Sequence, residues 1–598
     1  MNYAPSAIYD GLIAKCQQEL DLLKKKKQNI AWLRLGIVIA TALLARMVWD
    51  TSLAYIIGVI IIGIAAFLYA VSKDADVKSR MQHLKRLLTI NKEELPVLDN
   101  KYYHRQTGAE FEPEVHPYAN DFDVFGKASL YQYINRCTSE QGKHLLATHL
   151  LNATDKQTIL ATQEAVKEIT PAVEWRQQLE AYGMADALTH ETEERITAWL
   201  VKPDIYTQRY WRIVCYIYPV LTLGIGALYL LGILPSTLFS LSLLIFIIFS
   251  FSFSKKIHTV WQLLSRIVPQ ADTLYKQLEQ VEVNDFKSAL ISEIKQSIQS
   301  DNAVKASAEI RELKNILGRF DARLNVFAFF FLNTFLLWDL RQLVSLNNWK
   351  NKNKHALPNW FDAIAKTELL SSLATLSFNN PSWIFPEIAD EHFTLAGEAI
   401  GHPLIPADKR VTNSFSTEGI SKVSIITGSN MGGKSTFLRS VGVNIVFALM
   451  GAPVCASSFK VSVVKLMSSM RIADNLADNT STFYAELKKL RTIIESVNQH
   501  EKVYILLDEI LRGTNSLDRH TGSKALIKQM ILQQAVATIA THDVELAQLE
   551  QDFPHAISNY HFDVQVTNDE LYFDYKLKPG ICKSLNASIL MKKIGIEL

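Results

Sequence analysis

The stretch VSIITGSNMGGKSTFLRS, residues 423–440, decides the fold of the C-terminal part of this chain. It begins with an apolar, β-branched run, passes through a glycine-rich turn and continues into a helical pattern that starts at Lys434. Gly428, Gly433, Lys434 and Ser435 have the spacing G-x-x-x-x-G-K-[ST], which is typical of a phosphate-binding loop between a strand and a helix. The stretch therefore predicts an α/β domain that binds a nucleotide.

The residue types of this loop suit a triphosphate. Small residues allow backbone N–H groups to close around the phosphates, and the N-terminal end of the following helix adds a partial positive charge. Lys434 supplies a full charge for the β- and γ-phosphates, and the Ser435 hydroxyl is a ligand for Mg²⁺. We expect ATP and Mg²⁺ as cofactors. The residues expected to contact the nucleotide here are Gly428, Ser429, Asn430, Met431, Gly432, Gly433, Lys434, Ser435 and Thr436.

Two later apolar runs predict further strands whose ends meet this loop. KVYILLDEI, residues 502–510, ends with an acidic pair, and AVATIATH, residues 535–542, ends at His542. The pair suits a magnesium ligand followed by a general base, so Asp508 is the expected metal residue and Glu509 the expected catalytic base. His542 is a second catalytic candidate, as a sensor of the γ-phosphate; a purely structural role for it stays open.

Four segments resemble, in order, the ATPase motifs of the MutS family, whose nucleotide domain is similar to that of ABC ATPases. They are TGSNMGGKST (427–436), STFYAEL (481–487), LLDEILRGTNSLD (506–518) and ATHDVEL (540–546). Weaker likenesses lie in GHPLIP at 401–406, in the tail from Phe573 and, for the family's helical core, in residues 123–146. The resemblance implies a P-loop, ABC-like ATPase domain that hydrolyses ATP.

The resemblance also implies a homodimer with a composite site. One subunit would supply the loop lysine and serine and the acidic pair, and the other would present Ser481 and Thr482 to the γ-phosphate. Such a site couples ATP binding to closure of the two subunits. The alternative reading of Ser481 and Thr482 is a helix N-cap with Glu486 nearby.

Three departures from the family pattern limit what the resemblance implies. Ser429 stands where the family has proline after the lead glycine, and Leu511 stands where it has a small residue. Neither change removes a phosphate or metal contact. We also find no N-terminal module with a Phe-x-Glu wedge, the device with which mismatch readers of this kind unstack bases. ATP hydrolysis therefore transfers from the family, whereas DNA recognition stays open.

Two pairs of apolar stretches are long enough to cross a membrane. The first pair is Ile30 to Trp49 and Ser52 to Val71, and the second is Trp211 to Leu231 and Ser236 to Ser254. A spanning helix needs about 20 apolar residues. Lys and Arg flank both pairs but are missing from the two short connections, so the positive-inside rule places both termini and all large segments in the cytoplasm. Buried core helices of a soluble protein are the alternative.

A fifth apolar stretch, Val326 to Leu337, is too short to span, so we expect a core helix there. The whole chain then divides into five units, of which all but the last are helical in pattern. These are an N-terminal segment with a transmembrane hairpin (1–80), the first half of a helical core (81–210), a second transmembrane hairpin (211–256), the second, lever-like half of the core (257–376) and the α/β ATPase domain (377–598).

Composition narrows the functional classes. The 598 residues are 48% hydrophobic, enough for packed cores, and the net charge of +2 weighs against a large nucleic-acid surface. Five cysteines without a C-x-x-C pair weigh against a disulfide framework or a structural zinc site. Two functions remain. One is a membrane-anchored MutS-family ATPase that binds DNA, as in mismatch repair. The other is a membrane ATPase machine that acts on a protein or lipid partner without reading DNA.

Overall fold

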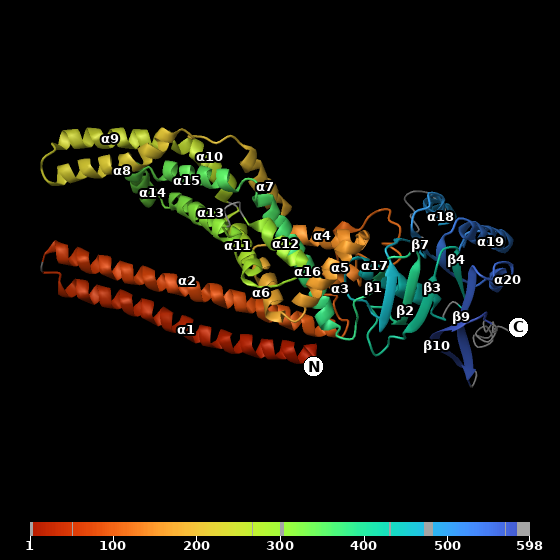
Figure 1. Cartoon of the computed structure of the whole chain (residues 1–598). Helices are drawn as coiled ribbons and strands as arrows, with labels where there is room; N and C mark the ends of the chain where they lie inside the picture. The colour runs from red at the N-terminus through yellow and green to blue at the C-terminus, as the bar shows by residue number, and fades with distance from the viewer. Residues whose placement is uncertain are drawn as a thin grey trace.

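The computed structural model describes residues 4–50, 52–265, 267–299, 304–429, 432–471, 482–567 and 570–582. The molecule is elongated, with an α/β domain at one end and two helical arms that project from the other end (Figure 1). A helical body joins the arms to the domain. The largely helical N-terminal region and the C-terminal sheets agree with the order predicted from the sequence.

The first arm is an antiparallel hairpin of two long helices, α1 (Pro5–Met47) and α2 (Leu53–Leu98). Its outer half is apolar and exposed, whereas its base carries the buried residues of both helices. α2 continues without a break past residue 80, so the apolar hairpin and its polar base form one helix pair. Both helices are long and apolar enough to cross a membrane.

The second arm contains α8 (Arg209–Leu230) and α9 (Ser236–Ser252), and α8 is the third helix that could cross a membrane. α9 is bent by 43° where it meets α10 (Ser254–Ser265). If this bent pair and a second one are each counted as one span, up to five helices among the described residues could span. The tips of both arms lie at the same end of the molecule (Figure 1).

The second bent pair corrects one prediction. The stretch from residue 326 forms α14 (Val326–Leu336), which is bent by 77° against α15 (Trp338–Asn353). The expected core position is wrong, because α14 packs on α8 and α9 and buries only Asn333 and Thr334. Its length excludes a complete span, but it does not place the helix in a core.

The helical body is built around α16 (Leu357–Asn379), most of which is buried. It contacts helices from both halves of the chain, so α8 and α9 project from within one body. Ser139, Asp155 and Thr189 cap three of the surrounding helices by accepting a hydrogen bond from a backbone N–H in the first turn. The remaining helices are α3 (Leu130–Ile134), α4 (Glu140–Leu151), α5 (Lys156–Ile169), α6 (Val173–Gly183), α7 (His190–Val201), α11 (Val268–Val283), α12 (Ala289–Ile298) and α13 (Ala306–Phe320), with short 3-10 turns η1 (Ala109–Phe111) and η2 (Asp321–Leu324).

A buried ion network joins the first arm to this body. The carboxylate of Glu94, near the end of α2, accepts hydrogen bonds from Arg105 (2.6 Å), Arg136 (2.8 and 2.9 Å) and Asn379 (2.7 Å). The Tyr9 hydroxyl of α1 donates to Asn379 Oδ1 at 2.7 Å. Because Asn379 ends α16, both helices of the arm are fixed where the chain leaves the body for the α/β domain. We call these five residues the arm joint.

The α/β domain contains a six-stranded sheet in the order β10-β9-β4-β8-β7-β6, parallel except for β10. Every residue of β7 and β8 is buried, which explains their continuous apolar sequences. A smaller sheet, in the order β1-β5-β2-β3, lies between the body and the large sheet (Figure 1). The strands are β1 (Glu387–Ala389), β2 (Thr394–Ile400), β3 (Asn413–Glu418), β4 (Lys422–Thr427), β5 (Ser458–Ser462), β6 (Lys465–Ser469), β7 (Val503–Asp508), β8 (Val536–Thr541), β9 (Ile557–Thr567) and β10 (Glu570–Pro579).

Helices connect the parallel strands of the large sheet. They are α17 (Lys434–Leu449), α18 (Thr482–Asn498), α19 (Ser516–Leu532), η3 (Val544–Gln548) and α20 (Leu549–Asp552). α17 is buried along nearly its whole length. It packs against the Phe122 ring at Gly442, where a larger residue would collide with that ring. The helix that begins at the candidate phosphate loop is therefore in direct contact with the helical body.

Candidate nucleotide-binding site

The glycine-rich loop follows β4 and ends where α17 begins. Gly428 and Gly433 have φ values of +142° and +99°, a region that residues with a side chain rarely adopt. A Cβ atom on Gly428 would lie 2.8 Å from the Phe562 carbonyl oxygen, so the backbones of the loop and of β9 approach too closely for any other residue. The start of the loop therefore lies directly against β9.

Lys434 is the first residue of α17 and is almost completely buried, with 3% of its surface exposed. Its Nζ donates hydrogen bonds to the carbonyl oxygens of Gly428 and Ser429, both at 2.8 Å, and lies 3.4 Å from His542 Nε2. Burial lowers the pKa of Lys434 to about 8, although the nearby carboxylates oppose this shift. The loop thus holds its lysine ammonium by neutral carbonyl groups, which a phosphate can replace.

The acidic pair lies beside this loop. Ser435 Oγ donates a hydrogen bond to Asp508 Oδ2 at 2.5 Å, so two oxygens suited to Mg²⁺ are adjacent. Glu509 Oε1 lies 2.5 Å from His542 Nε2. This hydrogen bond, together with the nearby Arg512, lowers the pKa of Glu509 although burial acts in the opposite direction. Glu509 is therefore an ionised carboxylate with a fixed orientation.

Strand order explains why these residues meet. β4, β8 and β7 are adjacent and parallel, so their carboxyl ends lie at one edge of the sheet. β4 leads to Lys434 and Ser435, β7 ends at Asp508 before Glu509, and β8 is followed by His542. The structure brings together these five predicted residues, and ligands of open α/β sheets bind at such an edge. Their chemical roles stay predictions.

The other predicted residues have different outcomes. Asn430, Met431 and Ser481 lie outside the described residues, and Thr482 is described only as the first residue of α18. Gly432 is buried in the loop, and Thr436 is exposed on α17. Ser429 Oγ is buried and has no hydrogen-bond partner within the part of the chain that the structure describes. A buried hydroxyl of this kind is a group that a ligand can satisfy.

The sequence does not predict the site contacts of two further residues. Arg512 Nε lies 3.1 Å from Glu509 Oε2, and its NH2 group donates to the Asp508 carbonyl oxygen at 2.9 Å. Glu486 of α18 accepts hydrogen bonds from the backbone N–H groups of Leu511 (2.6 Å) and Arg512 (3.1 Å). Glu509 and Leu511 both have positive φ, so this turn needs external support, which Glu486 provides. Glu486 is visible in the sequence three positions after Phe483, but its contact with the turn at Leu511 and Arg512 is not.

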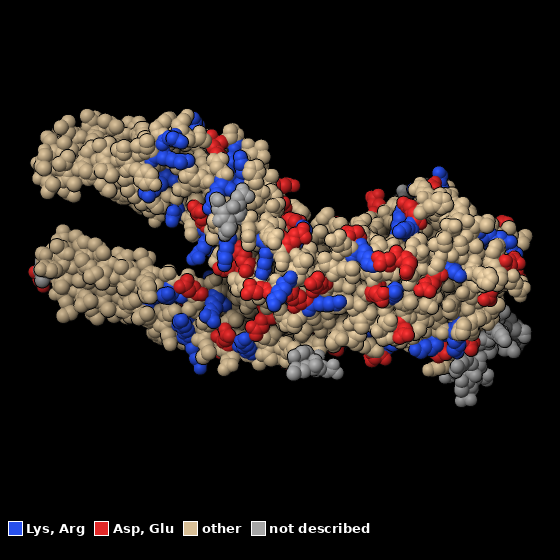
Figure 2. All heavy atoms as spheres, in the orientation of Figure 1, with Lys and Arg blue, Asp and Glu red and all other residues tan. Residues whose placement is uncertain are grey.

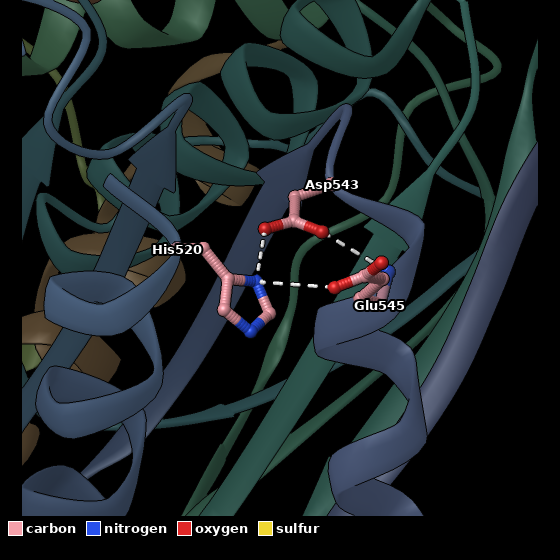
Figure 3. Close-up of side chains that lie close together, drawn as sticks. All are labelled: His520, Asp543 and Glu545. Carbon is pink, nitrogen blue, oxygen red and sulfur yellow. Dashed lines mark hydrogen bonds and ion pairs between the residues drawn. The ribbon is translucent and has the colours of Figure 1, made fainter. Parts of the chain in front are cut away.

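A cluster of His520, Asp543 and Glu545 lies beside the site (Figure 3). His520 Nδ1 of α19 is 2.6 Å from Asp543 Oδ2 and 3.9 Å from Glu545 Oε2. Asp543 also caps η3, because its Oδ1 accepts a hydrogen bond from the Glu545 N–H at 3.0 Å. The cluster joins α19 to the segment that directly follows His542, and this position gives it a structural role next to the site.

The residues fit Mg²⁺ and ATP. The loop offers an unsatisfied buried hydroxyl at Ser429 and a lysine whose ammonium donates to two carbonyl groups. Ser435 and Asp508 provide the oxygen ligands that Mg²⁺ prefers. Gly428 and Gly432 let the loop backbone lie directly against β9, because a Cβ atom at either position would crowd Phe562.

The fold and the site together define an α/β domain with a glycine-rich loop between a central strand and a buried helix. Residues 424–593 match the family model of MutS domain V. By this match the C-terminal domain belongs to the MutS family.

Similar proteins include MutS protein homolog 4 of Homo sapiens, which is 33% identical over 256 residues, 40% of this chain and 26% of the relative. The DNA mismatch repair protein MutS of Aquifex pyrophilus is 32% identical over 237 residues, 39% of this chain and 27% of the relative. The chain spans about a quarter of the length of the curated relatives it matches.

Proposed function

We propose that this protein is a membrane-anchored ATPase of the MutS family, with its α/β domain in the cytoplasm. One observation carries the proposal. Three adjacent parallel strands bring a buried lysine, a serine hydroxyl, an acidic pair and a histidine to one edge of the sheet. This set matches the parts that phosphoryl transfer from ATP requires.

The chain's own residues supply most of the chemistry. Lys434 exchanges its two carbonyl partners for phosphate oxygens, which favours its charged form. Ser435 and Asp508 hold Mg²⁺, which when bound neutralises charge on the phosphates. Glu509 accepts a proton from the attacking water, and His542 keeps this carboxylate oriented. Arg512 pairs with Glu509 in this arrangement and must leave one carboxylate oxygen available to water.

Membrane anchoring is supported by the two arms. On the face shown in Figure 2, the outer parts of both arms carry no Lys or Arg, and charged residues become frequent only nearer the body. Because both tips point the same way, both arms can enter one bilayer together (Figure 1). The helices α1, α2 and α8 have the length and apolar composition of spans, and α9 with its bend completes the second hairpin.

The composite dimer site forms part of the proposal. A second copy would bring its residues Ser481 and Thr482 to the nucleotide, and closure would reach the body through α17. DNA is one candidate partner, because the similar MutS of Aquifex pyrophilus is a DNA mismatch repair protein by name. A protein or lipid partner is the other, favoured by the small net charge of +2 and by the mixed charges on the visible surface (Figure 2).

The experiment is an ATPase assay on the full chain in lipid vesicles, with and without heteroduplex DNA at two salt concentrations. We expect Mg²⁺-dependent hydrolysis. A DNA partner predicts stimulation that falls steeply as salt rises, and unchanged turnover favours the protein or lipid partner. Complete absence of hydrolysis in vesicles and in detergent, for monomer and dimer alike, contradicts the proposed function.

A further inference from the structure

α14 exposes a large aromatic face. Val326 and Phe327 are 75% and 80% exposed, and Phe331 is 59% exposed. Its sequence VFAFFFLNTFL contains no charged residue. A contiguous exposed patch of this kind is rare on a surface in water and marks contact with a partner or a membrane. The helix is well formed, since Asn325 caps it by accepting a hydrogen bond from the Ala328 N–H.

α14 is continuous with the second arm. It packs on α8 and α9, and the Phe251 ring lies 5.7 Å from the Phe329 ring and 6.0 Å from the Phe330 ring. In Figure 1 it lies beside α8 at the base of that arm. Its exposed face therefore extends the apolar surface of the two candidate membrane helices rather than forming an isolated patch.

The C-terminal end of α14 is satisfied by side chains of α8. The last carbonyl groups of a helix have no partner within it. Here the Tyr218 hydroxyl donates to the Thr334 carbonyl oxygen at 2.9 Å, and Thr222 Oγ1 donates to the Phe335 carbonyl oxygen at 2.7 Å. Both donors lie in the middle of α8 and are buried. A helix can end at membrane depth only where the protein itself satisfies its free backbone groups, and the Thr334 and Phe335 carbonyl groups of α14 meet this condition.

Positive charge borders the base of this unit. Arg319 and Arg323 precede α14, and Lys255 and Lys256 follow α9. Arg323 lies over the Phe329 ring at 5.1 Å and pairs with the buried Asp339 at 3.4 Å, so its charge is compensated within the protein. The other three basic residues are exposed, and they suit the anionic headgroups of a cytoplasmic leaflet. Beyond Leu337, which has a left-handed conformation, the chain turns by 77° into the largely buried α15.

We propose that α14 is a membrane-embedded half-helix that lies in the cytoplasmic leaflet with its phenylalanine face against lipid acyl chains. This inference rests on the proposed anchoring of α8 and α9. Eleven residues of helix are about 16 Å long, roughly half of the 30 Å hydrocarbon core, so α14 enters one leaflet without crossing the bilayer. The second arm is then a three-helix unit with an internal polar seam at Tyr218 and Thr222.

The test measures the accessibility of nitroxide spin labels in the full chain, reconstituted in phosphatidylcholine–phosphatidylglycerol vesicles. Labels are attached through Phe327→Cys, through Ile245→Cys in α9 and through Leu160→Cys in α5, all at exposed positions. The five native cysteines are buried, so the unsubstituted chain gives the labelling background. Oxygen concentrates in hydrocarbon, whereas a polar nickel chelate is excluded from it.

We expect the label at 327 to resemble the label at 245, with relaxation by oxygen several-fold stronger than by the chelate, and the label at 160 to show the reverse. If the accessibility of the label at 327 resembles that at 160 while the label at 245 reports lipid, the inference about α14 is wrong and the proposed anchoring stands. If neither reagent reaches 327, a protein partner covers the face and the inference is wrong too. If 245 also reports water, the anchoring itself fails.

A second variant tests the polar seam. Tyr218→Phe combined with Thr222→Val removes both donors to the end of α14. We expect chelate access at position 327 to rise several-fold, because the helix loses its attachment to α8. The matched control is Thr41→Val in the first arm, where the hydroxyl donates to the Ile37 carbonyl oxygen of its own helix. An unchanged label in the double variant contradicts the role of the seam.

Discussion

The proposed function of the nucleotide-binding end depends on a few side chains, whereas that of the membrane end depends on many. At the edge of the large sheet, five side chains that lie at the carboxyl ends of three strands carry the proposed chemistry, and each has a specific partner within 3.4 Å. In the arms, dozens of exposed apolar residues share one task, and few of them have a specific partner. Between the two ends, the arm joint concentrates its charges on one carboxylate, Glu94. Single substitutions should therefore have large effects at the site and the joint and small effects in the arms.

The largest effect is expected at Glu509. Glu509→Gln removes the proposed base but keeps the shape of the side chain, so the rate of ATP hydrolysis should fall by about 10²–10⁴-fold while ATP stays bound. The control is Glu501→Gln at the opposite end of β7, where the carboxylate pairs with Lys465 away from the site. Single-turnover hydrolysis by the purified full chain measures both. A normal rate in the Glu509 variant would falsify the assigned base.

The next effect is expected at the arm joint. Glu94→Gln leaves Arg136 and Arg105 buried without their counter-charge, which costs roughly 3–5 kcal/mol of stability. Burial alone would raise the pKa of Glu94, but the two arginines lower it to about 2. The Glu94 carboxylate is therefore charged at neutral pH. The control, Glu174→Gln, breaks an exposed pair with Lys15 and should cost about 0–1 kcal/mol. Hydrogen exchange at the base of α1 and α2 distinguishes the two, and equal protection in both variants would refute the role of the joint.

A smaller effect is expected in the arms. Ile62→Lys places a charge in the middle of the apolar part of α2, at a cost of roughly 2.5–3.5 kcal/mol for insertion of that helix. Because α1 and the second arm keep their apolar surfaces, most of the protein should still sediment with membranes after a high-salt wash. Ile62→Leu is the matched control. Complete release of the Ile62→Lys protein would show that anchoring depends on a single helix, which would contradict anchoring by several helices of both arms.

The smallest effect concerns pH. The phosphates bind the charged form of Lys434, whose pKa in the free protein is about 8. Above that pH, ATP binding requires the uptake of a proton by Lys434, so ATP affinity should fall by at most about tenfold per pH unit. Below about pH 8, Lys434 is already charged and should cause no pH dependence of the affinity. Lys434→Arg keeps its charge throughout this range and should lose the dependence. A wild-type affinity that stays constant up to pH 9.5 would contradict a buried, titrating lysine at the loop.

Residues in local motifs could be predicted from the sequence, whereas contacts between distant segments could not. Lys434, Ser435, Asp508, Glu509 and His542 each follow a strand in a recognisable motif, and parallel pairing then brings them together. One contact that the sequence does not predict joins segments far apart in the chain. Glu486 supports a turn that lies 25 positions later, and no local pattern shows that contact.

In the helical region the apolar runs predicted the helices but not their bends. The stretch 326–337 was assigned to a core because its length excludes a span, and only the contacts of α14 with α8 and α9 revealed its position in the second arm. Those contacts join segments about 100 residues apart, and hydropathy carries no information about them. The five unit boundaries proposed from the sequence stay predictions.

The central claim is that the loop at 428–436 and the acidic pair at 508–509 form one Mg-ATP site. Equilibrium binding of Mg-ATP to the full chain in lipid nanodiscs tests it most directly, with Lys434→Ala compared against Lys422→Ala at the opposite end of β4. We predict saturable binding by the wild type and by Lys422→Ala, and affinity weaker by on the order of 100-fold in Lys434→Ala, since contacts to a charged group are worth about 1.5–3 kcal/mol. Equal affinity in all three proteins, or no binding by the wild type at millimolar nucleotide, would contradict the claim.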